Sequence, residues 1–217
     1  DRYGLIDGDE IELHDSHEFC EELFKECPNH VTLNGYFQSE KYFKNAEKLV
    51  RLDFRFRKHI IEEVEKHYSE YLKDKPVSIL VRDFNPDYDY PNCENNHINI
   101  PSEFYEKSID ILGKDRTYII CSNNIEQTKK QKVFQGDNFI FNEVVPDDIY
   151  KGHFDLCLMS MCQDFIISNS TFAWWGAWLG KGEGKRVLIP TPWYGPGLSH
   201  ISTDDLYPDE WEKIEWK

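Results

Sequence analysis

The stretch Asp164-Phe-Ile-Ile-Ser-Asn-Ser-Thr-Phe-Ala-Trp-Trp-Gly-Ala-Trp-Leu-Gly180 joins two apolar runs through a polar turn. The first run, residues 165–167, has the length and the side chains of a buried strand. The turn at residues 168–171 offers Ser170 or Thr171 as the N-cap of a helix. Residues 172–179 are apolar nearly all round, so the helix must be buried. The stretch therefore predicts a strand, a turn and a core helix.

A polar turn that opens a helix is also a ready anion site. The first amides of a helix have no intrahelical acceptor, and the helix dipole places partial positive charge there. A capped core helix without any ligand explains the same residues equally well. The residues alone therefore leave two interpretations open, a phosphate pocket and a purely structural helix.

The exact order of these residues resembles the α1,2-fucosyltransferase family. In that family an Asn-Ser-(Ser/Thr)-Phe-(Ser/Ala)-Trp-Trp-Gly-Ala-Trp-Leu run follows an apolar strand. The segments Leu33–Phe43 and Asp155–Cys162 resemble two further family motifs, in the expected order along the chain. The resemblance implies an inverting, metal-independent glycosyltransferase that moves a deoxyhexose, in the first instance L-fucose, from a GDP-sugar to a glycan hydroxyl.

The composition and the net charge limit the classes of partner and the cellular location that we expect for this chain. The chain has 217 residues and a formal net charge of −15, which disfavours nucleic acid and anionic membranes as partners. No apolar run approaches the roughly 20 residues that span a bilayer, and no signal peptide pattern is present. We expect a cytoplasmic protein with mostly reduced cysteines. The chain starts at Asp1 and lacks the Gly-rich start of family members, which suggests that it belongs to a longer, multidomain chain.

Apolar strands alternate with helices beyond Pro76, which predicts an α/β fold with a parallel sheet covered on both faces. We expect a GT-B-like arrangement, with a reduced, mainly helical N-terminal lobe at residues 1–75 and a Rossmann-like nucleotide-sugar domain at residues 76–217. The expected strands are residues 77–81, 118–121, 139–141, 165–167 and 187–189, after a short strand at 31–33. The expected helices are residues 54–72, 102–112, 125–132, 147–162 and 171–179, and a capping box at 15–18 predicts one more.

Arg82 directly follows the strand at residues 77–81, and ligands of such folds bind beyond the carboxyl ends of the strands. Guanidinium groups suit diphosphates because they bond two oxygens at once. The resemblance implies that Arg82 meets the donor phosphate. The family has a second Arg where this chain has Asp83, and an acid there is unfavourable unless it points away. We predict Arg82, Asp83 and Asp87 as the catalytic residues. By position, Asp83, Asp87 and Asp89 are the candidates for the general base.

The remaining predicted site residues bind the donor. The resemblance implies that Asp155 holds the guanine edge through two hydrogen bonds. Asn123, which follows the strand at residues 118–121, keeps hydrogen-bonding capacity where the family usually has an acid. The other predicted donor-binding residues belong to the turn and the helix that opens there, and they are Ser168, Asn169, Ser170, Thr171, Phe172 and Trp174.

Three alternatives stay open. The strings Asp7-Gly-Asp9 and Asp87-Tyr-Asp89 resemble the Asp-x-Asp of metal-dependent glycosyltransferases, although an acidic chain produces such strings by chance. The donor could instead be another GDP-deoxyhexose such as GDP-rhamnose. The chain could also be a non-catalytic nucleotide- or glycan-binding module of a larger protein.

Overall fold

The computed structural model describes residues 10–12, 18–21, 32–87 and 89–216. The chain forms two compact units, one of residues 1–50 with 199–209 and the other of residues 51–198 with 210–217. The capping box at 15–18 and the helix expected after it lie almost wholly outside the described residues, as do Asp7 and Asp9.

The smaller unit contains a parallel pair of short strands, β1 (Glu10–Glu12) and β2 (Thr32–Asn34). The strand expected at residues 31–33 corresponds to β2. The 3-10 helix Glu40–Tyr42 begins at Ser39, whose side chain accepts a hydrogen bond from the Lys41 amide. Asp205 pairs with the Lys41 ammonium group and accepts a hydrogen bond from the Phe19 amide at 2.9 Å. These contacts join both chain segments of the unit.

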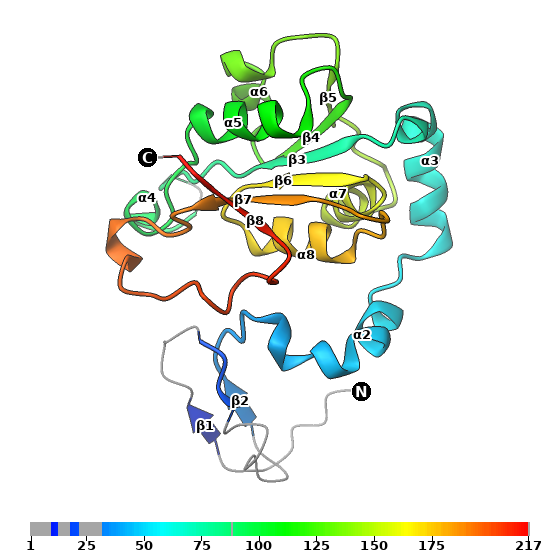
Figure 1. The fold of residues 1–217 in the computed structure, drawn as a ribbon. Helices are drawn as coiled ribbons and strands as arrows, with labels where there is room; N and C mark the ends of the chain where they lie inside the picture. Colours follow the sequence, from blue (N-terminus) through cyan, green and yellow to red (C-terminus); the bar gives the residue numbers. More distant parts are fainter. Residues whose placement is uncertain (1–9, 13–17, 22–31, 88, 217) are drawn as a thin grey trace. The chain divides into compact units, whose positions relative to one another are not determined.

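The larger unit is built on a parallel sheet of strand order β5-β4-β3-β6-β7-β8 (Figure 1). The strands are β3 (Val77–Val81), β4 (Tyr118–Ser122), β5 (Phe139–Phe141), β6 (Asp164–Ile167), β7 (Val187–Thr191) and β8 (Glu212–Glu215). The predicted α/β fold with a Rossmann-like parallel sheet is confirmed. The sequence analysis did not predict strand β8. Half-buried and exposed residues alternate along this strand, and it contains no continuous apolar run.

The strand order reverses between β3 and β6. From β3 the chain builds outward to β4 and β5, and from β6 it builds in the other direction to β7 and β8. Such a switch point leaves a crevice at the carboxyl ends of the two central strands, where open α/β sheets bind ligands. Arg82 follows β3 and Ser168 follows β6, so both stand at this crevice.

The helices of the larger unit follow the predicted pattern with shifts at their ends. They are α3 (Lys58–Lys73), α4 (Cys93–Asn96), α5 (Ser102–Leu112), α6 (Ile125–Thr128), α7 (Lys151–Ser160) and α8 (Thr171–Leu179), preceded by α2 (Glu47–Asp53). Helices α5 and α8 have the predicted bounds. Helix α3 begins later than residue 54, because Phe54 stacks on Trp175 at 4.7 Å and Arg57 is extended.

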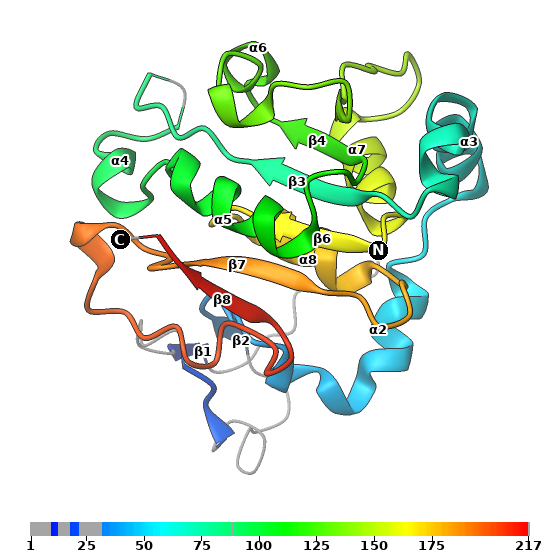
Figure 2. The ribbon, with the colours of Figure 1, turned by 45° about the horizontal axis from the view of Figure 1, so that its top comes forward.

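The two faces of the sheet carry different helices. Alternate strand residues such as Val77, Ile79 and Ile120 form one core with Phe104 and Tyr105 of α5. The opposite face carries α7 and α8, which pack on each other, and α7 also packs on α3 (Figure 2). Because α7 and α8 each follow a strand of the sheet, both begin near its carboxyl edge and end near its amino edge.

The division into units does not coincide with the domain boundary expected between residues 75 and 76. Helix α3 lies in the same unit as the sheet, because its apolar face packs on α7. Its buried residues Val64 and Tyr68 anchor this contact, and the Tyr68 ring lies 6.2 Å from that of Phe154. The change in pattern at Pro76 marks the first strand of the sheet and not the edge of a compact unit.

Candidate functional site

A pocket of ≈ 380 Å³ lies at the carboxyl edge of the sheet. Its walls come from the ends of β3 and β4 and from the starts of α7 and α8. The lining residues are Leu80, Val81, Arg82, Ser122, Asn123, Tyr150, Lys151, Gly152, Asp155, Ser170 and Phe172. Ligand pockets range from about 300 to 1,000 Å³. The sheet therefore brings Arg82, Asn123, Asp155, Ser170 and Phe172, which the sequence singled out, into one cavity.

Arg82 is the cation at the end of β3, and several contacts hold its guanidinium group in place. Nη2 pairs with Asp89, and Nη1 donates a hydrogen bond to the main-chain oxygen of Asp83 at 3.2 Å. The guanidinium carbon lies 4.6 Å from the centre of the Phe84 ring. With 25% of its side chain exposed, Arg82 is oriented in advance and still reaches the pocket.

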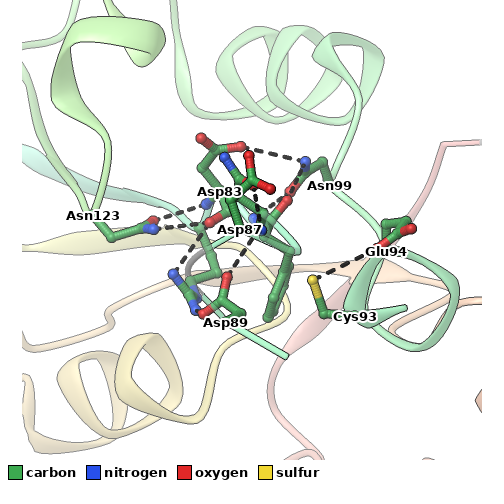
Figure 3. A network of polar contacts seen from close by, with 10 residues as sticks. Asp83, Asp87, Asp89, Cys93, Glu94, Asn99 and Asn123 are labelled. Carbon is green, nitrogen blue, oxygen red and sulfur yellow. Dashed lines mark hydrogen bonds and ion pairs between the residues drawn. The ribbon is translucent and has the colours of Figure 1, made fainter. Parts of the chain in front are cut away.

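The Asp83 carboxylate is engaged by two amide side chains. Oδ2 accepts a hydrogen bond from Asn124 at 2.6 Å. Oδ1 accepts one from Asn99 at 3.3 Å (Figure 3). Asn123 bonds the main chain of the same residue, accepting from its amide and donating to its carbonyl oxygen at 2.8 Å. Asp83 does not line the pocket. Its replacement of the family's second Arg therefore places no acid in the cavity wall.

The loop after β3 carries the other two acids. Asp89 accepts from the Asn85 amide at 3.0 Å and pairs with Arg82. Burial raises the pKa of Asp89, but these two contacts outweigh it, and the pKa lies below its ordinary value. Asp87 is exposed and does not line the pocket. Asp89 thus acts as the counter-ion that orients Arg82.

The buried side chains of Ser168 and Asn169 hold the turn before α8 in place. The Ser168 hydroxyl accepts a hydrogen bond from the Arg82 amide at 3.1 Å, which ties the end of β6 to the end of β3. The Asn169 amide donates to the carbonyl oxygens of Ile98 and Trp193 at 3.0 and 3.1 Å. Both side chains are buried, and neither residue lines the pocket. Their contacts fix the direction in which α8 begins.

Helix α8 opens onto the pocket. Ser170 is its N-cap, and the Ser170 hydroxyl accepts from the Ala173 amide, as predicted. Ser170 and Phe172 line the cavity, and Thr171 is exposed at the first position of the helix. Trp174 is placed differently from its prediction as a donor-binding residue. It is buried, and its ring lies 5.4 Å from Trp211 and 6.3 Å from Trp178.

Asp155 lies in the second turn of α7, where it joins a buried hydrogen-bond chain. Asn142 donates to its Oδ1 at 2.7 Å, and Asn142 in turn accepts from the Tyr68 hydroxyl at 2.7 Å. Lys151, one turn earlier on α7, pairs with both carboxylate oxygens at 2.8 and 3.1 Å. Burial raises the pKa of Asp155 above its ordinary value, against the opposing effects of Lys151 and Asn142.

Sequence reasoning missed Lys151, Asn142 and Tyr150. The spacing of Lys151 and Asp155 on a helix is the signal that could have found the first, because residues four apart share one face. Asn142 follows β5 and Tyr68 lies on α3, so their meeting depends on how these elements pack. The pocket therefore holds a second cation that the sequence did not indicate.

The two acids of the Asp87-x-Asp89 string have different surroundings. Within the part of the chain that the structure describes, no group of three or more His, Cys, Asp or Glu side chains could hold a metal ion. Asp89 is engaged by Arg82 instead. The pocket brings Arg82 and the start of α8 together with the Asp155 carboxylate.

The sequence profile of glycosyl transferase family 11 matches residues 14–215. The chain belongs to this family. An alpha-1,2-colitosyltransferase of Escherichia coli is 29% identical over 212 residues, which cover 93% of this chain and 68% of that protein. The O-antigen biosynthesis glycosyltransferase WbnK of Escherichia coli is 31% identical over 119 residues, which cover 52% of this chain and 38% of WbnK. The predicted family resemblance is confirmed.

Two solved structures show distant similarity. POFUT1 in complex with GDP-fucose superposes with a TM-score of 0.43 at 14% identity, covering 62% of this chain and 47% of that one. A family 9 glycosyl transferase from Veillonella parvula gives a TM-score of 0.42 at 13% identity, covering 74% and 41%. No described helix of this chain is long and apolar enough to cross a membrane.

Proposed function

We propose that the chain is a glycosyltransferase domain that moves a deoxyhexose from a GDP-sugar to a glycan hydroxyl, without a metal ion and with inversion at the anomeric carbon. L-Fucose is the first candidate for the sugar. Membership of glycosyl transferase family 11 supports this proposal. The main observation behind it is that Arg82, Asp155 and the start of α8 line one and the same cavity.

The leaving group is where charge develops in this reaction. As the bond to the sugar breaks, negative charge grows on the departing diphosphate and the sugar becomes oxocarbenium-like, as in glycoside hydrolysis. Arg82 and the amides of Thr171 and Phe172, at the start of α8, would stabilise that charge. The Ser170 amide donates to the Ser168 carbonyl oxygen at 2.7 Å instead. Arg82 and the start of α8 are fixed before the reaction by the contacts of Asp89 and Ser168, so little reorganisation is needed.

In this proposal, the guanine of the donor lies at the other end of the pocket. The Asp155 carboxylate would accept from the ring N–H and the exocyclic amine of guanine, a pair of donors that uracil lacks. In the structure the Lys151 ammonium group pairs with this carboxylate. The donor would displace Lys151 from Asp155, and the freed ammonium group would then add to the positive charge that faces the diphosphate.

The acceptor hydroxyl must lose a proton, and the loop after β3 supplies the candidates. Asp83 is held by Asn99 and Asn124, and Asp89 is paired with Arg82. Asp87 is exposed, as Asp89 is, but Asp89 is the one that pairs with Arg82. We therefore place Asp87 first among the three as the general base, with the acceptor sugar bound over the loop.

Titration calorimetry with GDP, UDP and GDP-fucose, each with and without EDTA, tests the proposal. We expect GDP and GDP-fucose to bind equally well with and without EDTA, and UDP to bind much more weakly. A preference for UDP, or binding lost in EDTA, would favour a metal-dependent enzyme. Binding without any donor hydrolysis or transfer would favour a non-catalytic module.

A different deoxyhexose is the second candidate. The relative matched over 93% of this chain is named an alpha-1,2-colitosyltransferase, so GDP-colitose joins GDP-rhamnose as an alternative donor. Competition between these donors and GDP-fucose for the same site would rank them. The donor with the highest kcat/KM, and not the tightest binding alone, identifies the sugar because specificity is expressed in the transition state.

The raised pKa of Asp155 makes donor binding depend on pH. Only the ionised carboxylate accepts two hydrogen bonds, so affinity for GDP-fucose should fall as the pH drops toward a pKa that lies above the ordinary 3.8. An Asp155→Asn variant should bind GDP-fucose at least about tenfold more weakly and with a flat profile, since its amide does not titrate. Calorimetry between about pH 5 and pH 8, a range around neutrality, checks this. Equal pH profiles for the two proteins would remove Asp155 from nucleobase recognition.

A further inference from the structure

A second cavity, of ≈ 290 Å³, lies in the larger unit at the ends of α7 and α8. Phe54, Phe56 and Leu179 contribute apolar walls, and Arg51, Arg55 and Lys181 contribute three cations. Helices α7 and α8 begin at the pocket that Arg82 and Asp155 line, called the donor pocket below, and they end at this second cavity. The second cavity is therefore at the edge of the sheet opposite the donor pocket, and it takes no part in the proposed transfer.

The segment that walls this cavity has the opposite charge from the chain. Residues 51–58 read Arg-Leu-Asp-Phe-Arg-Phe-Arg-Lys, with four basic side chains and one acid, in a chain of net charge −15. Charges are screened beyond about 8 Å at physiological ionic strength. An anionic partner that touches this segment therefore meets local positive charge, even though the protein as a whole is acidic.

Large apolar side chains stand between these cations and face solvent. Leu52 is 49% exposed and Phe54 is 43% exposed. The Phe54 ring stacks on Trp175 at 4.7 Å with an interplanar angle of 7°, and the Arg51 guanidinium lies 3.9 Å from the centre of the Trp178 ring. The tryptophans of α8 thus hold the segment in one conformation. Exposed apolar groups interleaved with cations are the composition of segments that lie in a membrane interface.

We propose that residues 51–58 and the cavity behind them dock on an anionic phospholipid surface. The exposed cations Arg55 and Arg57 would meet lipid phosphates, as would Lys58 when it leaves its ion pair with Glu62. Leu52 and Phe54 would enter the boundary between headgroups and acyl chains. A nucleic acid would use the cations and leave Leu52 and Phe54 exposed to water. Docking by this edge leaves the donor pocket, at the opposite edge of the sheet, open to soluble nucleotide-sugar.

Vesicle flotation tests this surface with a matched pair of variants. The variant Arg55→Glu/Arg57→Glu reverses two charges of the segment. The control Lys130→Glu/Lys132→Glu makes the same change in net charge beside α6, which lies away from the segment in the view of Figure 1. We expect the wild-type protein and the control to float with vesicles that contain phosphatidylglycerol, and not with pure phosphatidylcholine. Partitioning of the Arg variant should fall by at least about tenfold.

Added salt and a third variant separate the electrostatic contribution to vesicle binding from the hydrophobic one. Raising NaCl should weaken binding, and Leu52→Ser should weaken it further at every salt concentration. Equal flotation of the Arg variant and the control would overturn the proposal, as would equal binding to neutral vesicles. Self-association that the Arg variant abolishes, without vesicle binding, would assign the surface to a second copy of the chain. Thermal melting shows that each variant is folded, and because no readout uses nucleotide, the outcome is independent of the proposed function.

Discussion

Replacing Arg82 with Ala should lower kcat/KM for the donor by about 10²–10³-fold, which corresponds to roughly 3–4 kcal/mol of transition-state stabilisation. Arg82 lines the proposed donor pocket, where Asp89, the Asp83 carbonyl oxygen and the Phe84 ring hold its guanidinium group. Its positive charge should matter most where the departing diphosphate gains negative charge. Steady-state kinetics of transfer, with hydrolysis of GDP-fucose as a second assay, measures the loss.

Two further variants sharpen this test. Arg82→Lys keeps the charge but not the planar pair of donors, so it should recover only part of the activity. Arg116→Ala removes an arginine with a similar exposed fraction, 28% against 25%, that pairs with Asp164 at the far edge of the sheet. It should melt at a lower temperature and keep its affinity for GDP. Near-normal turnover in Arg82→Ala would remove Arg82 from the mechanism.

Trp174→Ala should destabilise the protein by about 3–5 kcal/mol, the usual cost of truncating a buried aromatic residue. Trp174 is 6% exposed and packs between Trp178 and Trp211, so the substitution leaves a cavity between α8 and the chain segment before β8. The melting temperature should fall by about 10 °C or more for a domain of this size. Differential scanning calorimetry measures the shift.

The neighbouring tryptophan is the matched control. Trp175 is half-buried, and it stacks on the exposed Phe54, so Trp175→Ala should cost clearly less stability. Below its melting temperature, Trp174→Ala should bind GDP with nearly wild-type affinity if its side chain only supports the core. A large loss of GDP affinity in a folded Trp174→Ala protein would instead favour the direct donor contact that the sequence predicted.

The sequence predicted those parts of the fold that local patterns control. Strands β3 and β5 and helices α5 and α8 have the predicted bounds, because each is a continuous apolar or amphipathic run between polar or glycine residues. The pattern failed where a distant contact overrides it. Residues 54–57 continue the helical spacing of α3, yet they are not helical, because Phe54 stacks on Trp175.

The candidate site divides in the same way. Arg82 and Ser170, which line the pocket, were both singled out from the sequence, since residues that closely follow parallel strands share one edge of the sheet. The partners of these residues were not found. The sequence identifies Asp83 as an acid beside the predicted phosphate site. Only the tertiary structure shows that Asn99 and Asn124 hold its carboxylate.

By itself the sequence determined the α/β class, the parallel strands, the capped start of α8 and the family, because each follows from residues that are neighbours along the chain. The tertiary structure decided the strand order, the pairing of Lys151 with Asp155, the packing of Trp174 against Trp211 and the exposure of the basic segment at residues 51–58. Periodicity records which face of an element is apolar. It does not record which other element covers that face, and that choice depends on the free energy of packing the whole chain.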